Sequence, residues 1–129
     1  MTLGRILVVD DEVYIQDLYQ SMLSVAGHEV VDTAYNGEEA VQKFESLRPP
    51  PDLVIMDHRM PIKNGLQATK EIVAFDPKAK VLVISADATV QPRCKDAGAV
   101  GFLEKPFTMD VLFRMIEVTI RGAAVQLER

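Results

Sequence analysis

Apolar runs and amphipathic stretches alternate along the whole chain. Uninterrupted apolar runs occupy residues 6–9, 53–56 and 81–84. Such runs, with no polar residue between the apolar ones, are typical of strands buried on both faces of a parallel sheet. Residues 28–34 are more polar, which fits an edge strand, and residues 100–104 fit a further strand. The pattern therefore predicts five strands.

The stretches between these strands have apolar residues at helical spacing. The residues expected to face the core are Ile15, Leu18, Met22 and Val25; Ala40, Val41, Phe44 and Leu47; Ala68, Ile72 and Phe75; and Met109, Leu112, Phe113, Ile116 and Ile120. Residues 87–97 are ambiguous, because Pro92 lets a helix begin near it but not run through from residue 87. Five helices are expected in total.

Capping residues mark the ends of the expected helices. Asn36 is a good N-cap, with Glu39 at the capping-box position three residues later. Thr108 is expected to cap the final helix. Helices are expected to end at Gly27, at Asp76–Pro77, at Gly98 and at Gly122.

Strict alternation of strands and helices predicts a parallel sheet with helices on both faces and right-handed crossovers. The polar strand 28–34 belongs at an edge, which favours the strand order 2-1-3-4-5 with a switch point between strands 1 and 3. This is the flavodoxin-like three-layer (βα)5 sandwich of the α/β class. The 129 residues suit one domain. Residues 1–122 are expected to form it, followed by a short tail, 123–129, without an output domain.

Composition excludes several classes of function. The net charge of −5, with no basic block, argues against a surface that binds nucleic acid. The single cysteine, Cys94, excludes an internal disulfide and a thiolate metal cluster. No apolar segment approaches the roughly 20 residues of a membrane span. No signal peptide is expected, because the first apolar run stops at Asp10, so the expected location is cytoplasmic.

Polar side chains follow or end four of the expected strands. They are Asp10, Asp11, Asp57, Ser85 and Lys105. Because the carboxyl ends of parallel strands meet at one edge of a sheet, these side chains are expected to share a crevice. Three clustered carboxylates repel one another and call for a cation. With no histidine or thiolate expected near them, a hard, oxygen-binding ion fits best, and that ion is Mg²⁺.

With a metal bound, Asp57 is suited to attack a phosphoryl group and form an acyl phosphate. Lys105 would then pair with the phosphoryl oxygens, and Ser85 would form a hydrogen bond to another of them. In-line phosphoryl transfer requires mainly positioning and charge neutralisation, which these residues supply.

Over almost its whole length the chain resembles the receiver domain of two-component response regulators. The resemblance rests on Val9-Asp10-Asp11-Glu12, on Met56-Asp57 with Met60-Pro61 and Gly65, on Ser85-Ala86, and on Lys105-Pro106-Phe107. It implies that Asp57 is the phosphoacceptor for a sensor histidine kinase or a phosphotransfer protein. It also implies that the chain is not an enzyme beyond catalysing its own phosphorylation and autodephosphorylation.

The resemblance further implies how the site residues share their roles. Asp11 and Asp57 would bind Mg²⁺ directly, Asp10 would bind it chiefly through water, and the backbone carbonyl of Arg59 would be a further ligand. The Lys105–Pro106 peptide bond would be cis.

A switch is implied as well, with Ser85 as its hydroxyl and Phe102 as its aromatic residue. The added phosphoryl charge draws Ser85 and Lys105 toward Asp57. The space that Ser85 leaves would let Phe102 turn inward, reshaping the surface formed by the fourth expected helix (within 87–97), the fifth strand (100–104) and the final helix after Thr108, the surface that controls a partner. An ordinary core aromatic without a switch role is the alternative for Phe102.

Two features depart from the common pattern of the family. The segment from Ser85 to Lys105 is shorter by about two residues, roughly half a helical turn, and contains Pro92. Helix 4 is therefore expected to be short or irregular. Arg59 and Asp87 stand two residues after the phosphoacceptor and the switch hydroxyl. We hypothesise that they form an ion pair over the site and modulate the lifetime of the phosphoryl group; two separately solvated charges are the alternative.

Other functions fit the residues less well. A Mg²⁺-dependent aspartyl-phosphate phosphatase of the haloacid dehalogenase type needs an acid two residues after its nucleophile, where Arg59 cannot shuttle a proton. A flavodoxin-like cofactor carrier needs a phosphate-binding loop where residues 10–12 are acidic. A phosphorelay intermediate and a receiver excised from a longer regulator remain open. The cognate kinase, the downstream protein and a phosphorylation-dependent homodimer also remain open.

Overall fold

The computed structural model describes residues 4–122, in which strands and helices alternate as expected. The elements are β1 (Arg5–Val9), α1 (Val13–Val25), β2 (Glu29–Ala34), α2 (Gly37–Ser46), β3 (Leu53–Asp57), α3 (Gly65–Phe75), β4 (Val81–Ser85), the 3-10 turn η1 (Ala88–Val90), α4 (Gln91–Ala97), β5 (Gly101–Glu104) and α5 (Met109–Ile120). The expected tail, 123–129, lies outside the described residues, as do residues 1–3 of the N-terminus.

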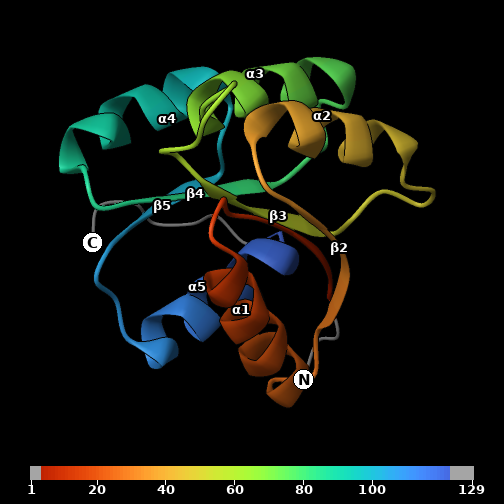
Figure 1. Cartoon of the computed structure of the whole chain (residues 1–129), viewed down its shortest axis with the longest axis vertical. Coiled ribbons are helices and arrows are strands. Elements are labelled where there is room, and N and C mark those ends of the chain that lie inside the picture. The colour runs from red at the N-terminus through yellow and green to blue at the C-terminus, as the bar shows by residue number, and fades with distance from the viewer. Residues whose placement is uncertain (1–3, 123–129) are drawn as a thin grey trace.

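The five strands form one parallel sheet in the order β2-β1-β3-β4-β5, which confirms the predicted topology. Helices α2, α3 and α4 cover one face, and α1 and α5 cover the other (Figure 1). The strand order reverses between β1 and β3, so the chain leaves β1 toward α1 on one face and leaves β3 toward α3 on the other (Figure 1). This divergence leaves a crevice at the carboxyl ends of the two strands. Within residues 4–122, no helix is both long and apolar enough to cross a membrane.

The uninterrupted apolar runs are explained by the two helical layers. Along β1, Leu7 and Val9 pack on the side of α2, α3 and α4, whereas Ile6 and Val8 pack on the side of α1 and α5. Both faces of the strand therefore require apolar side chains. The edge strand β2 has one neighbour, and only Ala34 is fully buried in it. This accounts for its polar sequence.

Helix α1 turns a different face to the core from the predicted one. Of the predicted stripe, Leu18 and Val25 are 51% and 87% exposed, and Ile15 and Met22 are only partly buried against the core. The fully buried residues are instead Gln16, Tyr19 and Leu23. The prediction was wrong because it assigned the polar Gln16 to solvent, whereas the side-chain amide of Gln16 bonds to backbone carbonyls inside the protein.

Two other predicted core residues lie near the surface at helix ends. Phe75, the last residue of α3, is 49% exposed, and its ring meets that of Phe44 edge-on at 6.3 Å between centroids. Met109, the first residue of α5, is 39% exposed. A terminal turn extends past the strands it covers, so helical spacing alone overestimates burial at the ends.

The region around Pro92 forms a short helix, as expected. Asp87 caps a single 3-10 turn, and α4 follows with Pro92 in its first turn, where a missing N–H costs no hydrogen bond. Helix α4 has 7 residues and ends at Gly98, whose φ of 96° is the left-handed conformation typical of this position.

Capping at α2 differs in detail from the prediction. The side chain of Asn36 accepts a hydrogen bond from the N–H of Glu39, as expected. The carboxylate of Glu39, however, accepts from the N–H of Tyr35 rather than from that of Asn36. The complete capping box is at α3, between Asn64 and Gln67. It fixes the start of the helix that follows the Asp57 loop.

Candidate functional site

The carboxyl ends of β1, β3, β4 and β5 bring the predicted site residues into one pocket of about 250 Å³. Its lining includes Asp10, Asp11, Asp57, Ser85 and Lys105, together with Glu12, Arg59 and Ala86. Asp10 follows β1, Asp57 ends β3, Ser85 ends β4 and Lys105 follows β5. The parallel sheet therefore gathers residues that are far apart in the chain.

Asp57 and Lys105 form a close pair within this pocket. The Nζ of Lys105 donates a hydrogen bond of 2.9 Å to Oδ1 of Asp57, which is 8% exposed. Burial raises the pKa of Asp57, against the hydrogen bond from Lys105. Burial lowers the pKa of Lys105, but its hydrogen bond to Asp57 and the surrounding negative charge outweigh this, so that the pKa is raised overall. The two shifts have different causes, because burial dominates for Asp57 and the neighbouring carboxylates dominate for Lys105.

Three carboxylates stand together at the mouth of the crevice. One oxygen each of Asp10, Asp11 and Asp57 lies within 4.8 Å of the others. The pKa of Asp10 is raised to about 6, first by burial and then by the charges of Asp57 and Asp11; the N–H of Glu12 and the charge of Lys105 oppose the shift. Among the described residues this group contains neither His nor Cys. An all-carboxylate donor set fits Mg²⁺.

The loop after β3 is folded tightly against the phosphoacceptor candidate. The N–H of Gly65 donates to the carbonyl of His58, and the N–H of His58 donates to the carbonyl of Ile84 on β4. A β-carbon at position 65 would collide with the backbone of Asp57 and His58, so only glycine allows this approach. Gly65 in the Asp57 motif thus lets the chain pass back across the end of β3.

Ser85 and Lys105 are joined through the backbone. The N–H of Lys105 donates to the carbonyl of Ser85 at 2.9 Å, which extends the pairing of β4 with β5 by one residue. The Oγ of Ser85 accepts a hydrogen bond of 3.1 Å from the N–H of Asp87. The Lys105–Pro106 bond is cis, as expected, and Arg48–Pro49 is a second cis bond that was not predicted.

Phe102 of β5 is turned inward. It is 8% exposed and belongs to the core cluster on the side of α2, α3 and α4. It lies on β5, which pairs with β4, the strand that Ser85 ends. Its role as a switch stays a prediction.

The expected ion pair over the site is present between Arg59 and Asp87. Nη2 of Arg59 lies 3.7 Å from Oδ2 of Asp87, and the two side chains are 81% and 32% exposed. Hydrogen bonds from the hydroxyl and N–H of Thr89 are the main reason that the pKa of Asp87 is lowered; the charge of Arg59 adds to them. At this distance and exposure the pair contributes little to stability.

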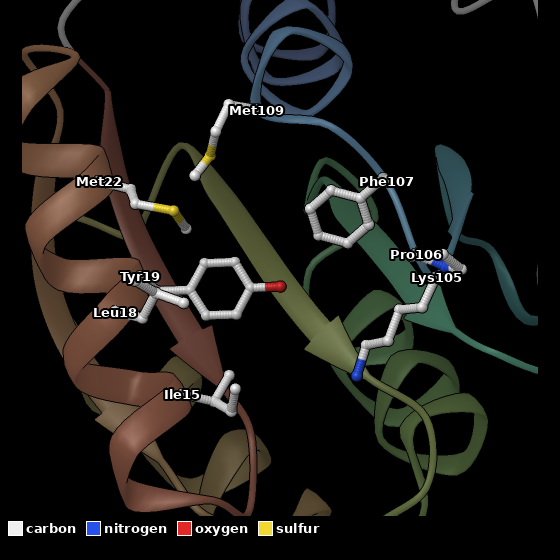
Figure 2. A pocket seen from close by; sticks show the side chains of 8 residues that line it. All are labelled: Ile15, Leu18, Tyr19, Met22, Lys105, Pro106, Phe107 and Met109. Carbon is white, nitrogen blue, oxygen red and sulfur yellow. The ribbon is translucent and has the colours of Figure 1, made fainter.

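A second pocket, about 360 Å³ in volume, lies beside the acidic one and was missed by sequence reasoning. It is mainly apolar and is lined by Ile15, Leu18, Tyr19, Met22, Lys105, Pro106, Phe107 and Met109 (Figure 2). The Tyr19 hydroxyl and the Lys105 ammonium both point toward the carboxyl end of β3 (Figure 2). Burial and the charges of Asp10 and Asp57 raise the pKa of Tyr19.

His58 was also missed, although it directly follows Asp57. It is 9% exposed, and its buried Nδ1 has no hydrogen-bond partner among residues 4–122. Burial lowers its pKa, and the charge of Arg93 lowers it further. A histidine at the end of an apolar strand is the only signal in the sequence, and it does not distinguish a buried side chain from an exposed one.

Comparison with known proteins agrees with this geometry. A family model described as the response regulator receiver domain matches residues 6–117. The chemotaxis protein CheY of Thermotoga maritima is 44% identical over 106 residues, which are 80% of this chain and 86% of that protein.

Two solved structures are similar over nearly the whole chain. The response regulator protein TrrA from Thermotoga maritima, in complex with Mg(2+)-BeF, matches with a TM-score of 0.82 and 37% identity, over 91% of this chain and 99% of that one. The receiver domain of a sensor histidine kinase from Pseudomonas aeruginosa, with a magnesium ion coordinated in its active site cleft, matches with a TM-score of 0.81 and 31% identity, over 93% of this chain and 99% of that one. The chain therefore belongs to the receiver domain family of two-component response regulators.

Proposed function

We propose that Asp57 accepts a phosphoryl group from a sensor histidine kinase or a phosphotransfer protein in a Mg²⁺-dependent reaction. One observation supports this above all others: the buried Asp57 carboxylate has Lys105 at 2.9 Å and shares its pocket with Asp10 and Asp11. A carboxylate in this position lines the crevice, has Lys105 to offset the charge of a phosphoryl group, and has two acids beside it that would hold Mg²⁺.

In the transfer, an Asp57 oxygen attacks phosphorus, and the bond from phosphorus to the donor breaks with its electron pair leaving on the donor. The product is an acyl phosphate at Asp57. Asp11 and Asp57 would hold Mg²⁺ directly, Asp10 through water, and Arg59 through its backbone carbonyl. Bound Mg²⁺ supplies positive charge that offsets the carboxylates and the phosphoryl oxygens.

Lys105 and Ser85 respond to the new group. The Lys105 ammonium, already beside Asp57, pairs with a phosphoryl oxygen, and the Ser85 hydroxyl donates to another. This hydroxyl now accepts from the N–H of Asp87, so moving it releases the start of the η1 turn. With Phe102 turning deeper, the surface of α4, β5 and α5 changes and controls a downstream protein.

The family is a signalling domain, and we propose that this chain catalyses only its own phosphorylation and autodephosphorylation. A phosphatase acting on other substrates is disfavoured by Arg59, which occupies the place of the general acid. We further propose residues 1–122 as the receiver, supported by the family match to residue 117 and by the end of α5 at Ile120.

The test of the phosphoacceptor uses acetyl phosphate and Mg²⁺, followed at once by intact mass spectrometry. Wild type is expected to gain one phosphoryl group, and the gain is expected to be lost when EDTA removes the metal. The Asp57→Asn variant is the matched control, because it keeps the shape of the side chain but lacks the nucleophile. Equal labelling of Asp57→Asn, or no labelling of wild type, would contradict the proposal.

We propose that the Arg59–Asp87 pair sets the lifetime of the phosphoryl group, because it stands over the path of the hydrolytic water. Removal of the exposed Arg59 side chain is expected to change the dephosphorylation rate about two- to fivefold, the scale of an exposed ion pair. Decay of labelled Arg59→Ala and Asp87→Ala is compared with that of wild type. If both variants decay at the wild-type rate, the pair has no such role.

A further inference from the structure

Helix α1 buries one polar side chain, Gln16, against the backbone at the end of β1. It is 1% exposed, in the first turn of the helix. Its Nε2 donates hydrogen bonds to the carbonyls of Ala34 at 2.8 Å, of Asp10 at 3.0 Å and of Val8 at 3.2 Å. An amide NH₂ has two hydrogens, so one of them is shared between two acceptors.

These hydrogen bonds fix the backbone where β1 and β2 end. The last register pair of the two strands is Val9 with Ala34, and the N–H of Asp10 then donates to the carbonyl of Ala34 at 3.0 Å. Gln16 bonds to that same carbonyl and to the carbonyl of Asp10 itself. The Asp10 peptide is thus fixed on its N–H side by β2 and on its C=O side by Gln16.

The turn that bears the acids has few other restraints. Helix α1 begins at Val13, its N-cap residue Glu12 makes no side-chain cap, and Asp11 is exposed. Within the turn, one hydrogen bond runs from the N–H of Glu12 to Oδ1 of Asp10 at 2.9 Å. The Oε1 of Gln16 has no partner among the described residues, so the amide is held through its donors alone. A side chain without N–H donors cannot replace it.

We propose that Gln16 is a positioning residue for the metal site, acting through the Asp10 peptide to place the carboxylates of Asp10 and Asp11 beside Asp57. This inference rests on the proposed Mg²⁺ dependence of the site. Residues that orient metal ligands without touching the metal contribute measurably to affinity, and their loss costs about ten- to a hundredfold in binding. Gln16 would orient Asp10 in this way, because its side-chain amide donates a hydrogen bond to the backbone carbonyl of Asp10.

The experiment compares Gln16→Met, which keeps the length of the side chain but has no donors, with Gln16→Asn, which keeps the amide but is shorter by one methylene. Gln20→Met, one turn later on the exposed side of α1, is the matched control. The first readout is the Mg²⁺ dissociation constant from calorimetry. The second is hydrogen exchange of the Asp10 amide in metal-free protein. The third is the rate of phosphorylation by acetyl phosphate at low and at saturating Mg²⁺.

Both Gln16 variants are expected to bind Mg²⁺ about tenfold more weakly, whereas Gln20→Met binds it as wild type does. The Asp10 amide is expected to exchange faster in them, and their phosphorylation rate to fall at low Mg²⁺ and recover at saturation. A folded Gln16 variant with wild-type Mg²⁺ affinity and wild-type exchange at Asp10 would reduce Gln16 to a packing residue. If Gln16→Met does not fold, Gln16→Asn decides the question.

The outcomes separate this inference from the proposed function. If wild type binds Mg²⁺ but takes no phosphoryl group, the phosphoacceptor proposal fails, and weaker binding by the Gln16 variants still supports the positioning role. If wild type is labelled at Asp57 and the Gln16 variants bind Mg²⁺ normally, the phosphoacceptor proposal is supported and the positioning role of Gln16 fails.

Discussion

Lys105 lines both the acidic pocket and the apolar pocket beside it, and the other lining residues of the two pockets differ. In the acidic pocket charge dominates: burial, together with the charges of Asp57 and Asp11, raises the pKa of Asp10. In the apolar pocket Tyr19, Met22 and Phe107 offer surface and no ionised group (Figure 2). The contrast suggests a division of work: the acidic pocket suits the proposed phosphoryl transfer, and the apolar pocket lies along the stem of Lys105.

The largest effect that separates the two pockets is expected for Lys105→Ala. This change removes the cation that we propose pairs with the phosphoryl group, and we expect phosphorylation by acetyl phosphate to slow about a hundredfold, the scale of losing one preorganised charge-stabilising donor. Rates are measured from the time course of intact mass at saturating Mg²⁺.

The matched control for Lys105→Ala is Met109→Ala, which trims the apolar pocket but leaves the acidic one intact. Its phosphorylation rate is expected to stay close to that of wild type. Equal losses in the two variants would mean that the apolar wall takes part in the chemistry, and the division between the pockets would fail.

A medium effect is expected on the stability of metal-free protein when Asp10 is neutralised. The pKa of Asp10 is raised from 3.8 to about 6, and that of Asp57 shifts the same way, so the folded state holds protons more tightly than the unfolded chain. The resulting stabilisation is complete below about pH 4 and is lost as the pH rises through 6. Asp10→Asn removes the buried charge and should raise the free energy of unfolding at pH 8 by about 1–2 kcal/mol.

Urea unfolding in EDTA at pH 5 and pH 8 measures this difference. Wild type is expected to be less stable at pH 8 than at pH 5, and Asp10→Asn to show a smaller loss. Asp17→Asn, an exposed acid of α1, is the control and should behave as wild type does. A wild type that gains stability between pH 5 and pH 8 would show that other groups outweigh the carboxylate cluster.

The comparison of the two pockets also separates what the sequence predicts from what it does not. The acidic pocket follows from apolar runs that end in Asp10, Asp57 and Ser85, because parallel strands must all end at one edge. Those runs can be recognised in the sequence because both faces of each central strand are buried. The strand order follows from the polar sequence of the edge strand and the short α4 from Pro92, whereas the family was recognised from the motifs around the site residues.

The apolar pocket escaped prediction because it depends on which face α1 turns inward. Helical spacing treats Gln16 as polar and therefore exposed, yet three backbone carbonyls at the ends of β1 and β2 satisfy its amide. The stripe consequently rotates, burying Tyr19 and exposing Leu18 and Val25. Tertiary hydrogen bonds decided this face, and no pattern within the helix records them.

The smallest effect is expected for Tyr19→Phe, which tests the border between the pockets. The ring of Tyr19 is buried, but its hydroxyl makes no hydrogen bond to any residue between 4 and 122, although it points toward the carboxyl end of β3 (Figure 2). We expect the phosphorylation and dephosphorylation rates to change less than about twofold, and the free energy of unfolding by less than about 1 kcal/mol, because no net hydrogen bond is lost. A tenfold change in either rate, with stability preserved, would instead place the hydroxyl among the groups that contact the phosphoryl oxygens or Lys105. The acidic pocket would then extend into the apolar one, and the apolar wall beside Lys105 would itself be part of the reactive site.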